Sequence, residues 1–265
     1  MLRVSDEFTW LFEARSLRSC DAVLRYFQAG ELPEAGVTIR QATLGLSGGP
    51  ETPVFFKQYN YRPPAWRFIG RASKARREFE NYAVFHRLGI PAAQAIACGE
   101  QRDAIGRLRR AFILTRAIQG AVPLNEFVQK TCGDRSRRET RATRTRLIEL
   151  IAAMTRRMHD AGFFHYDLVW RNLLVTPATN GASGVWWIDC PRGRFDHGSP
   201  LRRRRQLRDL ASLDKVASQL CPAGERVKFI KAYLKSIRLD REAKQLIRGV
   251  LDYRRKRWPE DWRGR

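Results

Sequence analysis

The 265-residue sequence has no long hydrophobic run and few cysteines. No stretch approaches about 18 uninterrupted apolar residues, so a membrane-spanning helix is not expected. The five cysteines form no C-x-x-C pair and are odd in number. They indicate neither a disulfide framework nor a zinc site, and a reducing compartment is expected. The first ten residues carry Asp6 and Glu7 and lack the apolar segment of a signal peptide, which favours a cytoplasmic location.

Acidic residues are also scarce, because 27 Asp and Glu stand against 50 Lys and Arg, giving a formal net charge of +23. A charge of this size attracts nucleic acid, an anionic membrane surface or an acidic substrate, and it does not distinguish among them. Arginine outnumbers lysine throughout, so genome composition accounts equally well for part of the charge. Apolar residues make up 43% of the chain, which is enough for a folded core.

The apolar pattern of the first 120 residues predicts an α+β arrangement. Residues 37–44 alternate apolar and polar side chains, and Gly48 and Gly49 separate them from a second strand, so the two form a hairpin. Ser73 is suited to cap a helix that ends before Gly89. Predicted strands are 37–44, 54–59, 93–98 and 111–117, and predicted helices are 17–27 and 73–88.

The pattern becomes helical after Gly120. Leu147, Ile151, Met154 and Met158 are spaced by four, three and four residues, which gives one apolar helix face. Two short strands at 173–175 and 185–188 follow, and the chain from 203 to 258 is predicted to be helical. We therefore expect one domain with two lobes: an α+β N-lobe over 1–118 with one main helix, and a mainly helical C-lobe over 119–265.

Asp167 and Asn172 stand five positions apart in the stretch Phe164–Val175, which reads F-H-Y-D-L-V-W-R-N-L-L-V. Phosphoryl transfer needs a carboxylate that orients the attacking hydroxyl and accepts its proton. It also needs an oxygen ligand for a Mg²⁺ ion that neutralises phosphate charge. A second metal ligand is expected at the end of the next strand, where Asp189 stands. Taken alone, Asp and Asn are also ordinary turn residues.

The stretch from His165 to Asn172 resembles the H-R-D-L-x-x-x-N loop of protein kinases, and Asp189 resembles the first residue of D-F-G. The resemblance implies a two-lobed protein-kinase-like fold that uses ATP and Mg²⁺. It makes Asp167 the catalytic base, assigns Asn172 and Asp189 to the metal, and gives His165 a structural role.

Two residues of the first lobe extend the resemblance. Lys57 lies in the strand V-F-F-K, like the lysine that pairs with ATP phosphates, and Glu78 on the following helix is its implied partner. Glu80 is the rival partner. A lysine in an apolar strand is costly to bury unpaired, although an edge-strand lysine can also extend to water.

Several features depart from regulated protein kinases. The turn Gly45–Gly49 is not G-x-G-x-x-G, Asp189 is followed by Cys190 and Pro191, and no A-P-E follows. Tyr166 replaces the arginine that receives the activation-loop phosphate in regulated kinases.

The departures fit another branch, because the chain resembles the bacterial lipopolysaccharide core kinases, the Kdo/WaaP group. The similarity rests on the segments V-F-F-K-Q-Y, A-R-R-E-F, L-G-I-P, F-I-L-T, M-H-D-A-G, H-Y-D, I-D with Arg192, R-D-L-A and a basic end at Tyr253–Arg257. It implies transfer of the ATP γ-phosphoryl group to a Kdo or heptose hydroxyl of lipopolysaccharide core. It also implies that Asp209 is a buried structural residue. We further expect peripheral contact of the protein with the inner membrane.

Arg171 stands directly before Asn172, where tyrosine kinases carry an arginine near the transferring phosphate. It is therefore predicted to be catalytic, with Arg192 helping to seat an anionic acceptor. For both, a solvated loop arginine is the alternative. A kinase for another small molecule or for a protein, and an inactive basic scaffold, are the alternative functions. A nucleic-acid partner is not expected, since it explains the charge but not Lys57, Asp167 or Asp189.

Overall fold

The computed structural model describes residues 1–27, 35–46, 48–179 and 182–262. The chain packs into two compact units. The first unit comprises Met1–Val84, Ala92–Ile118 and Cys190–Arg192, and the second comprises Phe85–Pro91, Gln119–Asp189 and Gly193–Arg265. Helices and strands are mixed, with the larger sheet in the first unit and most of the helices in the second, which confirms the predicted α+β class. In the described ranges, no helix combines the length and the apolar character that crossing a membrane requires.

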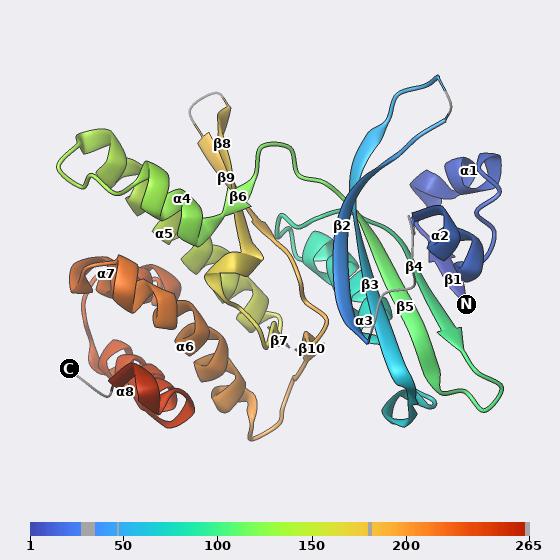
Figure 1. The fold of residues 1–265 in the computed structure, drawn as a ribbon. Coiled ribbons are helices and arrows are strands. Elements are labelled where there is room, and N and C mark those ends of the chain that lie inside the picture. The colour runs from blue at the N-terminus through green and yellow to red at the C-terminus, as the bar shows by residue number, and fades with distance from the viewer. Residues whose placement is uncertain (28–34, 47, 180–181, 263–265) are drawn as a thin grey trace. The chain divides into compact units, whose positions relative to one another are not determined.

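The first unit is built on a five-stranded antiparallel sheet with the strand order β1-β4-β5-β3-β2 (Figure 1). The predicted hairpin is confirmed, since β2 and β3 pair in register from Gly36↔Asn60 to Leu44↔Thr52. Ser47, in the turn between these strands, lies outside the described residues. The elements are β1 (Leu2–Val4), α1 (Asp6–Ala14), α2 (Cys20–Phe27), β2 (Gly36–Leu44), β3 (Thr52–Ala65), η1 (Trp66–Phe68), α3 (Lys74–Arg87), β4 (Ala95–Arg102) and β5 (Leu108–Arg116).

Helices α1 and α2 cover one face of this sheet, and α3 lies on the other face (Figure 1). Leu11, Leu24 and Phe27 of the helices pack against Phe56 and Phe112 of the strands in one buried apolar cluster. Phe27 stacks on Phe56 with ring centroids 5.0 Å apart. The sequence pattern did not predict α1, and it began α2 three residues too early.

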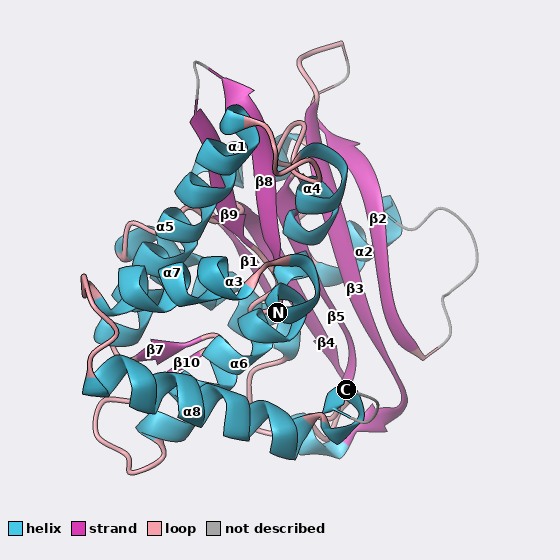
Figure 2. Ribbon diagram, turned by 90° about the vertical axis from the view of Figure 1, so that its left-hand side faces the viewer, coloured by secondary structure: helices cyan, strands magenta, loops and turns pink. Residues whose placement is uncertain are grey.

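The second unit contains four longer helices and two small antiparallel sheets, β6-β8-β9 (Figure 1) and β7-β10 (Figure 2). Helix α5 packs against α7 and α6 against α8. Their shared core includes Leu210, Ile230, Tyr233 and Leu246, all buried. The elements are β6 (Val122–Pro123), α4 (Leu124–Thr131), α5 (Arg138–Asp160), β7 (Phe163–Phe164), η2 (Trp170–Asn172), β8 (Leu173–Thr179), β9 (Ala182–Trp187), β10 (Arg194–Phe195), α6 (Arg202–Leu220), α7 (Ala223–Leu234), α8 (Arg241–Arg257) and η3 (Pro259–Trp262).

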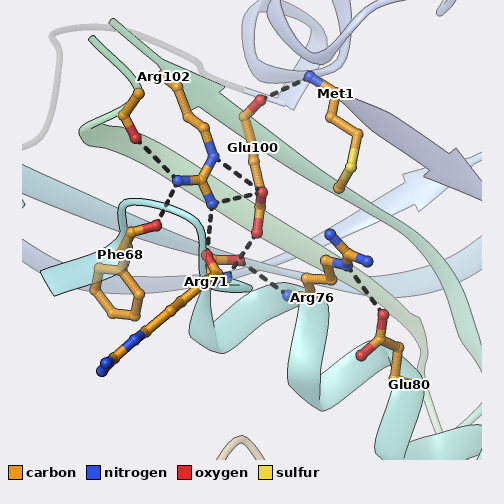
Figure 3. A network of polar contacts seen from close by, with 9 residues as sticks. Met1, Phe68, Arg71, Arg76, Glu80, Glu100 and Arg102 are labelled. Carbon is orange, nitrogen blue, oxygen red and sulfur yellow. Dashed lines mark hydrogen bonds and ion pairs between the residues drawn. The ribbon is translucent and has the colours of Figure 1, made fainter.

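The start of α3 is fixed by a buried carboxylate on β4 (Figure 3). One oxygen of Glu100 accepts a hydrogen bond of 2.7 Å from the Ser73 N–H, and the other pairs with Arg102 at 2.9 Å. Arg102 also donates to the carbonyls of Phe68 and Arg71. Ser73 caps α3 as predicted, since its hydroxyl accepts the Arg76 N–H. These bonds tie the segment before α3 to the sheet, so they position every residue along that helix.

Removal of the Glu100 charge should destabilise the fold in a pH-dependent way. Burial alone raises the pKa of the Glu100 carboxyl, but the bonds from Ser73 and Arg102 outweigh it and hold the pKa below its usual value. Glu100→Gln should lower the free energy of unfolding by about 3 kcal/mol at pH 7, because it removes the buried carboxylate that pairs with the half-buried Arg102 and accepts the Ser73 N–H. The deficit should shrink as the pH falls below about 4.3, where the carboxyl begins to bind a proton in the unfolded chain, and it should disappear once the pH has passed the lower pKa of the folded state.

Urea unfolding of both proteins between pH 7 and pH 3 measures this difference. Glu80→Gln is the matched control, because Glu80 pairs with Arg76 on the surface and such pairs contribute about 0.5 kcal/mol. An equal, pH-independent effect of the two substitutions would contradict the role given to Glu100.

Candidate active site

Lys57 and Glu78 form the ion pair that the sequence predicts. Lys57 lies in β3, Glu78 lies one turn into α3, and the Lys57 Nζ is 3.0 Å from the Glu78 Oε2. The Lys57 side chain is 13% exposed and that of Glu78 only 3%. A lysine held in this way presents a fixed positive charge beside the sheet, which suits a phosphate group.

Two tyrosines that the sequence did not indicate hold Glu78 in place. Its carboxylate accepts the hydroxyl of Tyr59 at 3.1 Å and that of Tyr82 at 3.3 Å. Tyr59 also lies under Lys57, with the Nζ 5.5 Å from the ring centroid. The rival residue, Glu80, pairs instead with Arg3 and Arg76 at the surface. The buried carboxylate is thus oriented by three donors, as a buried charge requires.

Further positive charge gathers beside Lys57 in the first unit. Burial lowers the pKa of Lys74 at the start of α3, and the nearby cations of Arg192 and Arg67 lower it further. Arg192 itself is exposed. This part of the molecule is therefore electropositive, and a polyphosphate would relieve the mutual repulsion of its cations.

In the second unit, the loop from His165 to Asn172 is held by a buried carboxylate of α6. The Asp209 side chain is fully buried, and it accepts the backbone N–H of His165 at 2.8 Å and that of Tyr166 at 2.9 Å. The structural role that the family resemblance implied for Asp209 is confirmed. His159 completes the environment, since its ring lies 3.4 Å from Asp209 and 2.8 Å from the hydroxyl of Tyr233.

Tyr166 adopts a left-handed backbone conformation, with φ at 67°. A bulky side chain rarely takes this conformation, which is strained by about 1–2 kcal/mol. The two hydrogen bonds that Asp209 accepts compensate for the strain and hold the sharp turn of the chain before Asp167. The Asp167 carboxylate is consequently presented on a partly exposed turn and not on a regular strand.

Asn172 and Asp189 lie at the same end of the β8–β9 hairpin. The register pairs Leu173 with Trp187, and the Ile188 N–H donates to the Asn172 carbonyl at 3.0 Å. Asp189 is the next residue, in a left-handed turn with φ at 55° that Asp tolerates. The Asn172 amide nitrogen donates to the Asp167 carbonyl at 2.9 Å, which connects Asn172 to the loop.

His165 serves the loop from inside. It is fully buried, its ring stacks on Phe85, and burial lowers its pKa so that the neutral form is favoured. Its Nδ1 accepts the Asp167 N–H at 3.3 Å. This position agrees with the structural role predicted for it, because a neutral buried imidazole cannot reach a substrate.

The sequence comparisons agree with this arrangement. Residues 64–233 match the model of the lipopolysaccharide kinase (Kdo/WaaP) family. The chain belongs to this family. The matched region contains the His165–Asn172 loop and Asp209, whereas Lys57 lies before it. No curated protein sequence matches the chain significantly.

Among solved structures, the chain resembles "WaaP in complex with acyl carrier protein". The TM-score is 0.70, the sequence identity is 20%, and the alignment covers 99% of each chain. At this identity the likeness establishes the fold, and family membership identifies the chain as a kinase of the lipopolysaccharide type.

The second unit provides oxygen donors for the metal that the family implies. Because the Asn172 amide nitrogen is engaged by the Asp167 carbonyl, the amide oxygen remains the free acceptor of that side chain. With the Asp189 carboxylate, this gives the amide and carboxylate oxygens that Mg²⁺ prefers, the remaining ligands being phosphate and water. The donor set therefore fits Mg²⁺.

Arg171 lies in the short helix η2 and is exposed. Its guanidinium makes no hydrogen bond or ion pair with any residue that the structure describes. Such a side chain is available to a ligand. Sequence analysis missed a second group of arginines, Arg194, Arg205 and Arg208, which surrounds Tyr166; its only signal was the dense basic run Arg202–Arg205.

Proposed function

We propose that this family member transfers the γ-phosphoryl group of ATP to a Kdo or heptose hydroxyl of lipopolysaccharide core. The observation that carries the proposal is the His165–Asn172 loop, whose backbone is held by the buried Asp209 in a chain of the lipopolysaccharide kinase family. The loop supplies a carboxylate and an amide next to one another, which are the groups that this chemistry requires.

Each residue receives one role in this proposal. Asp167 accepts the proton of the acceptor hydroxyl while the hydroxyl oxygen attacks the γ-phosphorus of ATP. Arg171 stabilises the negative charge on the transferring phosphoryl group. Asn172 and Asp189 would hold Mg²⁺, which would supply positive charge to the phosphates. Lys57, oriented by Glu78, binds the ATP phosphates. The product is a sugar phosphate, and ADP leaves with the remaining two phosphates.

Asp167→Asn should slow transfer by about 10²–10⁴-fold, because an amide cannot accept the hydroxyl proton. The assay measures incorporation of labelled phosphate from Mg-ATP into core lipopolysaccharide taken from cells that lack this kinase. Thermal stability and nucleotide binding should stay close to wild type, since the Asp167 side chain is partly exposed.

Asp160→Asn is the matched control, because it makes the same change at an exposed carboxylate that pairs with Arg156 at the end of α5. In the same assay, Arg171→Ala should lower kcat more than it raises KM. Near-normal turnover of a folded Asp167→Asn protein would remove Asp167 from the role of base. ATP binding without transfer by the wild type would favour the inactive-scaffold alternative.

We also propose that the second unit contacts an anionic membrane surface through the loop between α7 and α8. Ile237 is 88% exposed at the tip of this loop, and Leu239 is also exposed. Lys235, Arg238 and Arg241 flank these apolar side chains and are exposed as well. An apolar tip ringed by cations suits a leaflet with anionic lipids, where each cation contributes about 1 kcal/mol.

Vesicle co-sedimentation tests this surface. Wild-type protein should sediment with vesicles that contain anionic phospholipid and not with purely zwitterionic vesicles, and Ile237→Ser should weaken the binding several-fold. Ile105→Ser is the control, since Ile105 is 55% exposed in a turn of the first unit. Equal loss of binding in both variants, or none in either, would exclude the α7–α8 loop as the contact.

The helical unit offers a site for a further partner. A cavity of about 300 Å³ lies among α4, α5, α6, α7 and α8, with a mostly apolar lining that includes Ile151, Leu213, Val227, Ile230 and Leu251. Protein interiors are normally close-packed, so a void of this size favours an apolar occupant. Since the similar WaaP was solved with acyl carrier protein, we propose that this chain also binds such a protein and takes its acyl chain into the cavity.

Titration with acylated and unacylated carrier protein tests this partner. The acylated form should bind at least about tenfold more tightly, since each buried CH₂ contributes about 0.8 kcal/mol. Val227→Phe, which narrows the cavity, should abolish the difference, whereas Lys244→Ala on the exposed face of α8 should preserve it. Equal wild-type affinity for both forms would exclude the cavity as an acyl site.

A further inference from the structure

Three guanidinium groups surround the ring of Tyr166. The Arg194 guanidinium carbon lies 4.5 Å from the ring centroid, that of Arg208 lies 5.0 Å away, and that of Arg205 lies 5.8 Å away. Arg194 comes from β10, and the other two come from successive turns of α6. Residues from two elements are thus brought to one aromatic ring in the His165–Asn172 loop.

The positive charge of this group exceeds the negative charge beside it. Arg205 pairs with Asp196, a buried carboxylate that also accepts the Ser199 N–H. Within the described ranges of the chain, neither Arg194 nor Arg208 has a carboxylate partner. Asp209, which follows Arg208, is occupied by the backbone of the loop. The three cations and the carboxylates of Asp196 and Asp209 leave one net positive charge, and the guanidiniums of Arg194 and Arg208 stay without an ion pair inside these ranges.

The tyrosine ring only partly offsets this excess. A cation near an aromatic face gains about 0.5–1 kcal/mol at a partly exposed site, whereas cations gathered around one ring repel one another. A phosphate monoester carries −1.5 to −2 charges near neutral pH, which is enough to pair with both Arg194 and Arg208. Guanidinium forks also bind phosphate oxygens in pairs, so charge and geometry favour the same ligand.

The arginines around Tyr166 lie next to the loop that carries the proposed catalytic base. Tyr166 directly precedes Asp167, and β10 pairs with β7, the strand that leads into the loop. Tyr166 also occupies the position at which regulated protein kinases place a phosphate-binding arginine. In this chain, arginines of β10 and α6 supply positive charge beside Tyr166 instead.

We propose that Arg194, Arg205 and Arg208 bind a phosphate monoester already carried by the acceptor, so that the enzyme favours an acceptor phosphorylated at a second position. This inference rests on the proposed sugar-kinase function and names a specificity site for it. The group is a positioning site, because its guanidiniums contact the acceptor away from the transferring phosphoryl group.

Binding is tested without turnover by calorimetric titration of the full chain with glucose 6-phosphate and with glucose. Mg²⁺ and a non-hydrolysable ATP analogue are present to occupy the nucleotide site. Wild-type protein should bind the phosphorylated sugar and not glucose. Arg208→Ala should weaken this binding about tenfold or more, and Arg208→Lys should recover part of it, since the charge stays and the fork is lost. Arg204→Ala, an exposed arginine of the same helix, should bind like wild type.

Acceptor kinetics then identify the source of the phosphate. Core lipopolysaccharide from cells that lack the kinase is compared before and after phosphatase treatment. Treatment should raise the acceptor KM of the wild type and of Arg204→Ala about tenfold, without changing the KM for ATP. It should have little effect on the acceptor KM of Arg208→Ala, which is high from the start.

An unchanged wild-type KM after phosphatase treatment would overturn the proposal, even if sugar phosphate binds, because the site would then serve a free anion. Equal binding by Arg208→Ala and wild type would overturn it as well. If the titrations behave as expected while neither acceptor is phosphorylated, the anion site is supported and the proposed sugar-kinase function fails.

Discussion

The buried carboxylate of Asp209 is the constraint on which the second unit's functional loop depends. Two backbone N–H groups at a left-handed turn point inward, where water cannot satisfy them. Each would cost about 1–3 kcal/mol if left unpaired, and the turn itself adds strain. The Asp209 carboxylate accepts hydrogen bonds from both groups. The turn therefore requires a buried acceptor, and the same two hydrogen bonds stabilise the buried charge of Asp209.

Helix α6 couples this structural role to recognition. Asp209 follows Arg205 by four residues, so the two lie on the same side of the helix, and Arg208 is next to Asp209 in the chain. The residue that shapes the Tyr166 backbone and two residues that surround the Tyr166 ring are therefore carried by one rigid element. Any displacement of α6 would alter both the loop and its charged surroundings, which makes their geometry mutually dependent.

Local patterns in the sequence predicted the parts of the fold that depend on local interactions. The Ser73 cap and the apolar face of α5 each depend on neighbours a few residues away, and each is present. Residues 37–44 form the predicted strand, but Val37 and Ile39 are exposed, so their alternation with polar residues does not mark a buried face. The cover formed by α1 and α2 was not predicted, because these short helices are stabilised mainly by a sheet whose strands lie further along the chain. The periodicity of a short segment carries no information about a packing partner that lies far along the chain.

The same distinction applies to the candidate site. Lys57 and Glu78 were paired from strand and helix positions 21 residues apart, with the family pattern as a guide. The family pattern also identified Asp209. The hydroxyls of Tyr59 and Tyr82 and the guanidiniums around Tyr166 were missed, because aromatic and arginine residues are common and only the tertiary fold brings these together. The catalytic and metal roles of Asp167, Arg171, Asn172 and Asp189 stay predictions.

The structure also explains how a net charge of +23 is distributed. Several acidic side chains are engaged by buried or half-buried arginines: Arg144 pairs with Glu225, and Arg254 and Arg226 share Asp214. Burial requires these arginines to be paired, since an unpaired buried cation is strongly unfavourable. With 27 acidic residues against 50 basic ones, the acids engaged inside the fold are not available to neutralise its surface. Exposed arginines such as Arg194 are therefore left without acidic partners, so the interior pairing and the proposed binding of phosphate and lipid have the same origin in this imbalance.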